Sequence, residues 1–233
     1  MSNIVTKTKV LKVDPVSPDE KIIRYAAGII SGGGLVAFPT ETVYGIGADF
    51  FNKEAVKKLY QIKRRPLNKP FTAHISSVTA IKKMRCEITN FAEALIKKFW
   101  PGPLTLILKS THPTTHSTDA VEKGTLFHCV SGMGSGMGKI GFRMPGNTVA
   151  RALIAASGGV VAAPSANFSG EKPPVEAGVI SEGITEGLNL ILDGGKTRIG
   201  IESTIVDMTV SPYRILRHGA IARHSIERVT RGG

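Results

Sequence analysis

Apolar residues recur along this chain with two spacings, one typical of amphipathic helices and the other of short buried strands. A spacing of three to four residues predicts helices at about 17–30, 52–63, 78–84, 90–99, 147–156 and 175–183. Short apolar runs, most of them bounded by glycine or proline, predict strands at 35–38, 43–48, 71–75, 104–108, 126–130, 140–144, 160–163, 190–192, 203–207 and 213–216. Strands and helices alternate, which favours an α/β domain with a mixed sheet.

Residues at the segment ends indicate where the helices begin and stop. Ser17 followed by Pro18 predicts a first helix that is capped at the serine and starts at the proline. Three glycines at 32–34 end that helix, and Gly158 ends the helix at 147–156. No long linker separates the segments, so we expect a single domain over residues 1–233 with its core at about 15–220.

The composition is that of a folded chain. Hydrophobic residues make up 42% and charged residues 21% of the sequence, which is enough apolar surface to offset the conformational entropy lost on folding. No apolar stretch reaches the ~20 residues that cross a bilayer, and residues 1–13 lack the apolar core of a signal peptide. Cys86 and Cys129 lie far apart in the sequence, which argues against a disulfide framework. We therefore expect a cytoplasmic protein without membrane contact.

The charge balance indicates an anionic partner. Thirty lysines and arginines against 18 acidic residues give a formal net charge of +12. Nucleic acid, a nucleotide or phosphate would suit such a chain, and a generally basic proteome is the alternative explanation. No RNP, zinc-finger or helix-turn-helix signature accompanies the charge. A phosphate-bearing small molecule therefore explains it as well as RNA does.

Two polar segments directly follow predicted buried strands, at the end of a sheet where α/β proteins bind ligands. Residues 39–47 read Pro-Thr-Glu-Thr-Val-Tyr-Gly-Ile-Gly, which places Thr40, Glu41 and Thr42 where they could face a ligand. An ordinary polar turn is the alternative. Residues 163–170 read Ala-Pro-Ser-Ala-Asn-Phe-Ser-Gly, in which Ser165 and Asn167 could bind a ligand or cap a loop.

A basic segment at 63–70 forms a third candidate. Lys63, Arg65 and Lys69 could hold a polyphosphate, because arginine offers phosphate a planar fork and lysine a mobile charge. A solvated helix end is the alternative. His74 follows on the next strand and is by default an ordinary core or surface histidine. A fourth candidate is the segment 202–207, with Arg217 beyond it.

Several common catalytic devices are missing from the sequence. The glycine-rich stretch at 132–139 ends in Gly-Lys, but Met133 and Ile140 stand where a phosphate-binding loop needs glycine and serine or threonine. His112 and His116 have a metal-like spacing without a third ligand nearby. No serine or cysteine nucleophile pattern is present. We expect neither a metal held by the protein nor covalent catalysis.

Six motifs occur in order at residues 33–47, 62–71, 99–105, 143–145, 163–170 and 203–207. Together they resemble the YrdC-like family, the threonylcarbamoyl-AMP synthases. The resemblance implies an α/β fold in which a twisted mixed sheet flanked by helices encloses a deep basic cavity. It also implies a reaction that joins L-threonine, bicarbonate or CO₂ and ATP into threonylcarbamoyl-adenylate and pyrophosphate, for later transfer to adenosine in tRNA.

The same resemblance implies roles for individual residues. Lys63 and Arg65 would be the catalytic pair that stabilises negative charge on the phosphoryl oxygens. The implied ATP contacts are Arg65, Lys69, Lys139, Ser165, Asn167, Pro173 and Arg217. The implied threonine contacts are Thr42, His74, Arg143, Ala163 and Ser203. Mg²⁺ is expected on the triphosphate, held mostly by phosphate and water. The implied partner is a tRNA-modifying threonylcarbamoyl transferase, and direct binding of tRNA or other RNA stays open.

Three features depart from the family's usual pattern. Residues 111–138 are longer and richer in glycine, Asn147 stands where a histidine is common, and the chain ends soon after 217–219, as in the short single-domain members. Two other functions remain compatible with the residues. One is an RNA-binding module without chemistry of its own, which the charge suggests. The other is an enzyme that adenylates a carbamate on a different acceptor.

Overall fold

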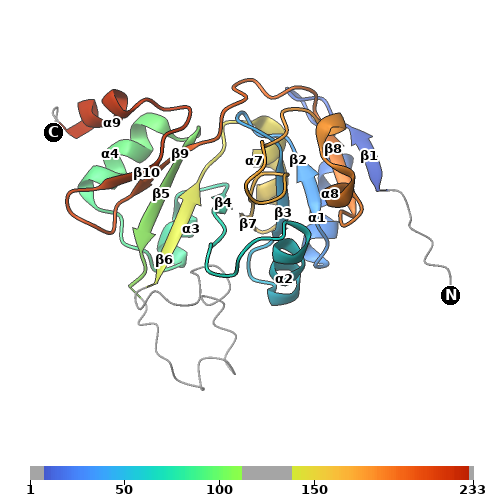
Figure 1. Ribbon diagram of the computed structural model, residues 1–233, viewed down its shortest axis with the longest axis horizontal. Coiled ribbons are helices and arrows are strands. Elements are labelled where there is room, and N and C mark those ends of the chain that lie inside the picture. The colour runs from blue at the N-terminus through green and yellow to red at the C-terminus, as the bar shows by residue number, and fades with distance from the viewer. Residues whose placement is uncertain (1–7, 112–137, 231–233) are drawn as a thin grey trace, which may run out of the picture.

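The computed structural model describes residues 8–111 and 138–230, and these build one mixed sheet of ten strands (Figure 1). The strands are β1 (Lys9–Lys12), β2 (Val36–Phe38), β3 (Gly45–Asp49), β4 (Ala73–Ile75), β5 (Leu104–Lys109), β6 (Lys139–Arg143), β7 (Val160–Ala162), β8 (Leu190–Asp193), β9 (Thr204–Asp207) and β10 (Arg214–Arg217). Their order across the sheet is β1-β8-β2-β3-β7-β4-β6-β5-β9-β10. Four parallel pairs, β1–β8, β2–β8, β4–β6 and β5–β9, are mixed with antiparallel ones, as the pattern predicts.

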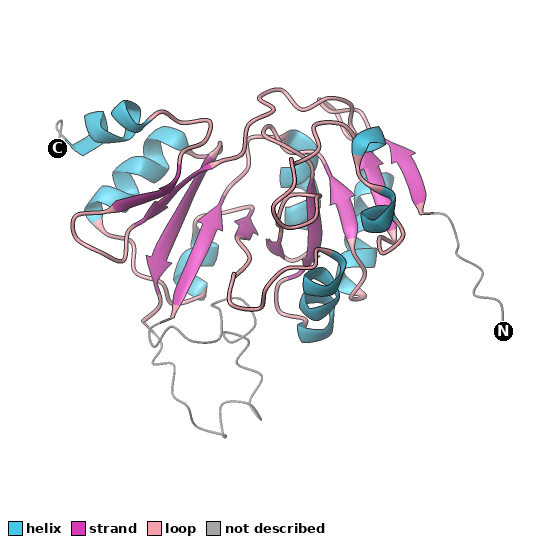
Figure 2. Cartoon of the chain, viewed as in Figure 1, coloured by secondary structure: helices cyan, strands magenta, loops and turns pink. Residues whose placement is uncertain are grey.

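Helices flank this sheet (Figure 2). They are α1 (Glu20–Ser31), α2 (Lys53–Ile62), α3 (Thr79–Lys83), α4 (Asn90–Phe99), α7 (Thr148–Ala156), α8 (Glu182–Thr185) and α9 (Arg223–Thr230), with a 3₁₀ turn η1 (Ala177–Val179). Among the described residues, no helix is long and apolar enough to cross a membrane.

Alternating side chains along the strands pack against two separate hydrophobic cores. In β8, Leu190 and Leu192 belong to the core formed with α1 and α7, whereas Ile191 belongs to a larger core on the other face with α2, α3, α4 and α9. Val161 in β7 also packs in the α1–α7 core, and its partner across β4–β7 is His74. His74 therefore lies on the same face of the sheet as α1 and α7. The cavity described below lies on this face, beside the two helices.

Two helix predictions are wrong, one at its start and one over its whole length. Asp19, and not Ser17, caps α1, because the Asp19 carboxylate accepts a hydrogen bond from the Lys21 backbone nitrogen at 2.7 Å. The helix therefore starts two residues after Pro18. The predicted helix at 175–183 is also wrong, since only the 3₁₀ turn η1 and the four-residue α8 form there. Gly178 and Gly183 lower helix propensity in this segment.

Two elements give no clear hydrophobic pattern in the sequence. β1 is an edge strand that, among the described strands, pairs with β8 alone, and three of its four residues are exposed. α9 has a mean hydropathy well on the polar side and buries Ile226 and part of Val229 against α4. The predicted strand at 126–130, the histidines at 112 and 116, Cys129 and most of the glycine-rich stretch lie outside the described residues.

Candidate functional site

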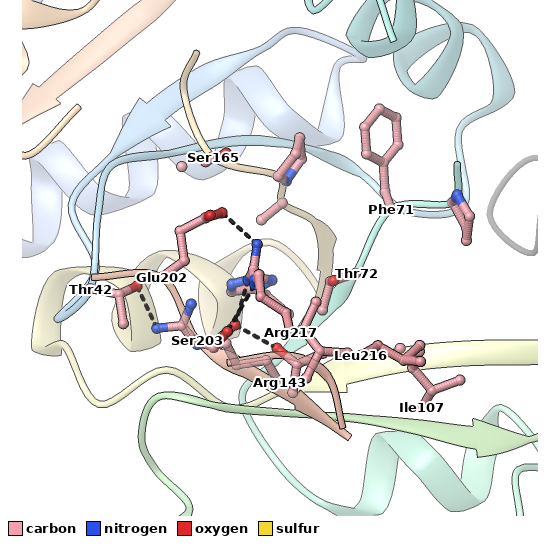
Figure 3. Close-up of a pocket in the computed structure, with 18 of the residues that line it drawn as sticks. Thr42, Phe71, Thr72, Ile107, Arg143, Ser165, Glu202, Ser203, Leu216 and Arg217 are labelled. Carbon is pink, nitrogen blue, oxygen red and sulfur yellow. Dashed lines mark hydrogen bonds and ion pairs between the residues drawn. The ribbon is translucent and has the colours of Figure 1, made fainter. Parts of the chain in front are cut away.

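A cavity of about 610 Å³ hollows one face of the sheet, a size typical of small-molecule sites. Strands β5, β6 and β9 contribute alternate side chains to it, β4 and β10 contribute further residues, and loops from 40–45, 65–72 and 163–165 complete its wall (Figure 3). Its charged lining residues are Arg65, Lys139, Arg143, Arg217, Glu202 and Asp207. Cations outnumber carboxylates, so the lining of the cavity is net positive.

Strand register brings His74 and Arg143 side by side, since the two residues are partners in the β4–β6 pair. The Arg143 side chain is only 6% exposed. Its Nη2 donates to Glu41 Oε1 at 2.8 Å and to Thr42 Oγ1 at 2.8 Å. Figure 3 shows the Arg143 side chain directed at Thr42. The loop after β2 is thereby fastened to β6.

The same loop is held by backbone hydrogen bonds and by Thr40. The Thr40 hydroxyl accepts from the backbone nitrogens of Thr42 and Val43, at 3.1 and 3.2 Å. The backbone nitrogen of Ile199 donates to the Glu41 carbonyl, and that of Gly200 donates to the Thr42 carbonyl, each at 2.9 Å. These bonds fix Glu41 and Thr42 in place beside Arg143.

His74 is an uncharged member of this lining near neutral pH. Burial, with the nearby charge of Arg143, lowers the pKa of His74 to about 3. Its Nδ1 is buried and has no hydrogen-bond partner within residues 8–111 and 138–230. A neutral imidazole can accept a hydrogen bond as well as donate one, so His74 suits a polar ligand rather than an anion.

Arg217 is fixed by three contacts with one short segment (Figure 3). Its Nη1 lies 2.5 Å from Glu202 Oε1, its Nε donates to the Ser203 carbonyl at 3.0 Å, and its Nη2 donates to Ser203 Oγ at 3.0 Å. The Ser203 hydroxyl also lies 2.8 Å from Thr105 Oγ1. Because a guanidinium has five N–H groups, Arg217 keeps two of them for a ligand.

Lys139 and Asp207 form the other charged pair of the lining, with Nζ 3.5 Å from Oδ2. Burial by itself would raise the pKa of Asp207, but hydrogen bonds from Thr209 and the charge of Lys139 lower it overall. The Asp207 carboxylate is therefore already paired with Thr209 and Lys139. Lys139 remains 35% exposed and can reach a ligand in the cavity.

Arg65 stabilises the loop that carries it. Its Nε donates to the Lys69 carbonyl at 2.9 Å and its Nη2 to the Pro70 carbonyl at 3.0 Å. Its guanidinium also stacks over the Phe71 ring, 5.2 Å from the centroid. Burial is the main cause that lowers the pKa of Arg65, and the pKa of a guanidinium starts high enough that the charge is kept. The loop thus presents a permanent cation to the cavity.

Lys63 lies behind the cavity wall instead of lining it. Its side chain is fully enclosed, at 1% exposure, and Nζ donates hydrogen bonds to the carbonyl oxygens of Ser165 and Asn167. Burial, followed by the charge of Arg65, lowers the pKa of Lys63 to about 8. Lys63 therefore ties the end of α2 to the segment that carries Ser165 into the cavity.

The structure brings most of the predicted contacts to one place. Those that line the cavity are Thr42, Arg65, His74, Lys139, Arg143, Ala163, Ser165, Ser203 and Arg217. Lys69 is exposed outside it, and Pro173 is half-buried outside it. The Asn167 amide nitrogen donates to the carbonyls of Phe168 and Glu171, both at 2.8 Å, so this side chain shapes its own loop.

Several polar lining residues received no role from the sequence. They are Tyr44, Asn68, Thr72, Thr105, Glu202 and Asp207. Thr105 is the one polar residue in the apolar run at 104–108, a signal that this position faces something other than the core. Glu202 and Asp207 lie in a segment that the sequence did single out, but their partners are set by the fold.

A net-positive, arginine-lined cavity on one face of an α/β sheet is the kind of site that suits an anionic small molecule. The comparison with family models is more specific. The Sua5/YciO/YrdC family model, described as "Telomere recombination", matches residues 28–219. The chain belongs to this family, as the six motifs predict.

Similar proteins agree with this assignment. The chain is 42% identical over 211 residues to the threonylcarbamoyl-AMP synthase of Pyrococcus abyssi, over 91% of this chain and 58% of the relative. It is 33% identical to the putative threonylcarbamoyl-AMP synthase of Mycobacterium tuberculosis, over 93% of this chain and 92% of that protein. The crystal structure of P. abyssi Sua5 complexed with L-threonine superposes with a TM-score of 0.80 at 40% identity, covering 95% of this chain and 61% of that one. The chain therefore spans somewhat over half the length of its P. abyssi relative.

Proposed function

We propose that the chain synthesises L-threonylcarbamoyl-adenylate from L-threonine, bicarbonate or CO₂ and ATP, with release of pyrophosphate. The observation that carries this proposal is a single cavity with two chemically different groups of residues. Arg143 stands beside neutral His74, which suits an amino acid, while Arg65, Lys139 and Arg217 supply the charge that a polyphosphate needs. The names of the relatives, and the threonine complexed with P. abyssi Sua5, support these substrates.

The threonine contacts would gather around Arg143. Its guanidinium would bind the amino-acid carboxylate through the nitrogens that Glu41 and Thr42 do not use. The remaining contacts from the motif match, all in the cavity lining, are Thr42, His74, Ala163 and Ser203. Hydroxyl and imidazole groups suit the polar groups of threonine, because each can donate and accept hydrogen bonds.

ATP would lie against the three remaining cations and Ser165. Lys69, Asn167 and Pro173 would then contact the nucleotide only after local movement, because they lie outside the lining. The described residues contain no group of three or more histidine, cysteine, aspartate or glutamate side chains suited to a metal. Mg²⁺ would be held mostly by the triphosphate and water, where it would offset the phosphate charge.

The proposed reaction needs positioning and positive charge more than a nucleophilic side chain. The carbamate oxygen of N-carboxylated threonine attacks the α-phosphorus, the bond from phosphorus to the bridging oxygen breaks, and pyrophosphate leaves. Arg65 and Arg217 would stabilise the negative charge that spreads over the phosphoryl oxygens. Lys63 would act by holding the carbonyls of Ser165 and Asn167, which fixes the segment on which the nucleotide lies.

The rest of the proposal concerns the protein's setting. The adenylate would pass to a threonylcarbamoyl transferase that modifies tRNA. The chain would act in the cytoplasm, where thiols stay reduced, and its buried Cys86 is a free thiol. One sheet runs from β1 to β10, which supports a single domain over about 15–220. The net charge of +12 also supports direct contact with RNA.

Pyrophosphate release tests the proposed function. With ATP, Mg²⁺ and bicarbonate, wild type should release pyrophosphate only when L-threonine is added. Arg65→Ala should lower this rate by about a hundredfold or more, because it removes a cation from the reacting phosphate. Lys57→Ala, an exposed lysine on α2, is the matched control and should retain the rate.

The other outcomes point to other functions. Release that depends on a different amino acid or on carbamoyl phosphate would identify another acceptor. No release, together with tRNA binding that weakens steeply with salt, would identify an RNA-binding module.

A further inference from the structure

The pair formed by Glu41 and Arg143 has a consequence beyond holding the loop. We propose that Glu41 is a positioning and specificity-determining residue: it fixes Arg143 and sets the charge at that part of the cavity so that an amino acid binds there and a phosphate group does not. The inference rests on the proposed function for the identity of the amino acid.

Glu41 acts through Arg143, since it does not itself line the cavity. The side chains of Glu41 and Arg143 are 3% and 6% exposed, and Oε1 and Nη2 lie 2.8 Å apart. Thr42 takes the second contact of the same nitrogen. Both hydrogens of Nη2 are thus used, and Nη1 is left for a ligand. A bound carboxylate would meet a guanidinium whose direction is already fixed and whose charge is already matched.

Arg143 balances the negative charge of Glu41, and few other groups contact this carboxylate. Its second oxygen, Oε2, is buried without a hydrogen-bond partner among the described residues, and so is Nε of Arg143. Few dipoles of the protein are therefore turned toward this carboxylate. Because the protein interior screens charges weakly, the charge of Glu41 still acts on an anion that enters the cavity.

The charge balance differs between the two groups of lining residues. Around Arg143, the one cation is matched by Glu41, and His74 is neutral. A zwitterionic amino acid, which carries no net charge, suits such a place. The three cations Arg65, Lys139 and Arg217 outnumber the carboxylates of Glu202 and Asp207 that pair with them. Phosphate dianions should therefore bind at the three cations, and Glu41 should repel them from Arg143.

Glu41→Gln tests this directly, because glutamine keeps the oxygen that accepts from Arg143 and removes the charge. At saturating ATP and Mg²⁺, inorganic phosphate should leave the KM for threonine of wild type unchanged. In Glu41→Gln, phosphate should compete with threonine and raise its KM about tenfold, with little change in kcat. Glu176→Gln, which alters an exposed ion pair with Lys196, is the control and should behave as wild type. A Glu41→Gln protein whose KM for threonine ignores phosphate overturns the proposal.

A second experiment needs no variant and no turnover. Calorimetry compares wild-type binding of the phosphonate analogue of threonine, at a pH where it carries two negative charges, with binding of its monomethyl ester, which carries one. The ester should bind about tenfold tighter in spite of its added methyl group. Equal or tighter binding of the free phosphonate overturns the proposal. If threonine binds with this preference but no pyrophosphate is released, the proposed function fails and the role of Glu41 stands; if neither threonine nor the ester binds, both fail.

Discussion

Lys63 keeps its ammonium group inside the protein, between the carbonyl oxygens of Ser165 and Asn167. The sequence singles out this lysine as one cation in a basic segment, but it cannot show that the side chain points inward. The partner carbonyls lie about a hundred residues further along the chain, and only the folded path of the segment 163–168 brings them to α2. Burial is what separates Lys63 from the solvated lysines around it.

The lowered pKa of Lys63 predicts how stability depends on pH. Its value of about 8 lies below the ordinary 10.5, so the unfolded chain binds the proton more tightly and the folded state gains stability as pH rises between these values. From pH 7.5 to 9.5, wild type should gain about 2 kcal/mol of unfolding free energy relative to Lys63→Met, which has no group to titrate there. Urea unfolding at both pH values measures this. A constant difference between the two proteins would contradict it.

The contact between Arg143 and Glu41, like the burial of Lys63, could not be predicted from the sequence. Each lies in a motif that the sequence identifies, and the chemistry of arginine predicts a carboxylate-binding role for Arg143. Their contact spans 102 positions. It depends on the β4–β6 register and on the loop after β2, neither of which a local pattern specifies.

Among the helices and strands, local sequence signals predict an element correctly wherever a capping residue and a periodic apolar face agree. The helix predicted at 90–99 matches α4, which Thr89 caps through a hydrogen bond from the Ala92 nitrogen, and the helix at 52–63 matches α2 to within a residue at each end. The prediction fails at 175–183, where glycines interrupt the apolar positions. It also misses β1 and α9, whose stability comes mainly from tertiary contacts with β8 and α4.

Asn147, a position at which the family resemblance predicts histidine, has a structural role in this chain. Its Oδ1 accepts a hydrogen bond from the Ala150 nitrogen at 3.0 Å and caps α7. Asn147→Ala should lower the free energy of unfolding by about 1 kcal/mol, since it removes this acceptor. Asn147→Asp should retain the cap and most of the stability. Thermal or urea unfolding checks both, and a loss of threonine affinity without a loss of stability would instead indicate a role in the site.

Across the whole molecule, the sheet order decides where the cavity lies. The motifs predict that the polar segments meet, and the rule for α/β sheets predicts a site at strand ends. The cavity instead extends over the face of β4, β5, β6, β9 and β10, strands from distant parts of the sequence. Strand order comes from long-range pairing, so the sequence pattern could not give it.

Because this face carries both groups of cavity residues, ligand binding should stabilise the fold as a unit. Saturation with ATP and Mg²⁺ at about a hundred times the dissociation constant should add about 2.7 kcal/mol to the stability of wild type. Arg217→Ala should lose most of this gain at the same ATP concentration, because its cation and the contacts that orient it are removed. Lys57→Ala should keep the gain. A thermal shift titration distinguishes these results; an unchanged shift in Arg217→Ala would place ATP elsewhere.

The most direct test of the central claim is the mass of the product. Wild-type protein is incubated with ATP, Mg²⁺, L-threonine and ¹³C-labelled bicarbonate, and the quenched mixture is analysed at once by mass spectrometry. The account predicts threonylcarbamoyl-adenylate that carries one labelled carbon, formed together with pyrophosphate and missing when threonine is left out. Unlabelled adenylate, an adenylate of another acceptor, or ATP that stays intact would contradict it.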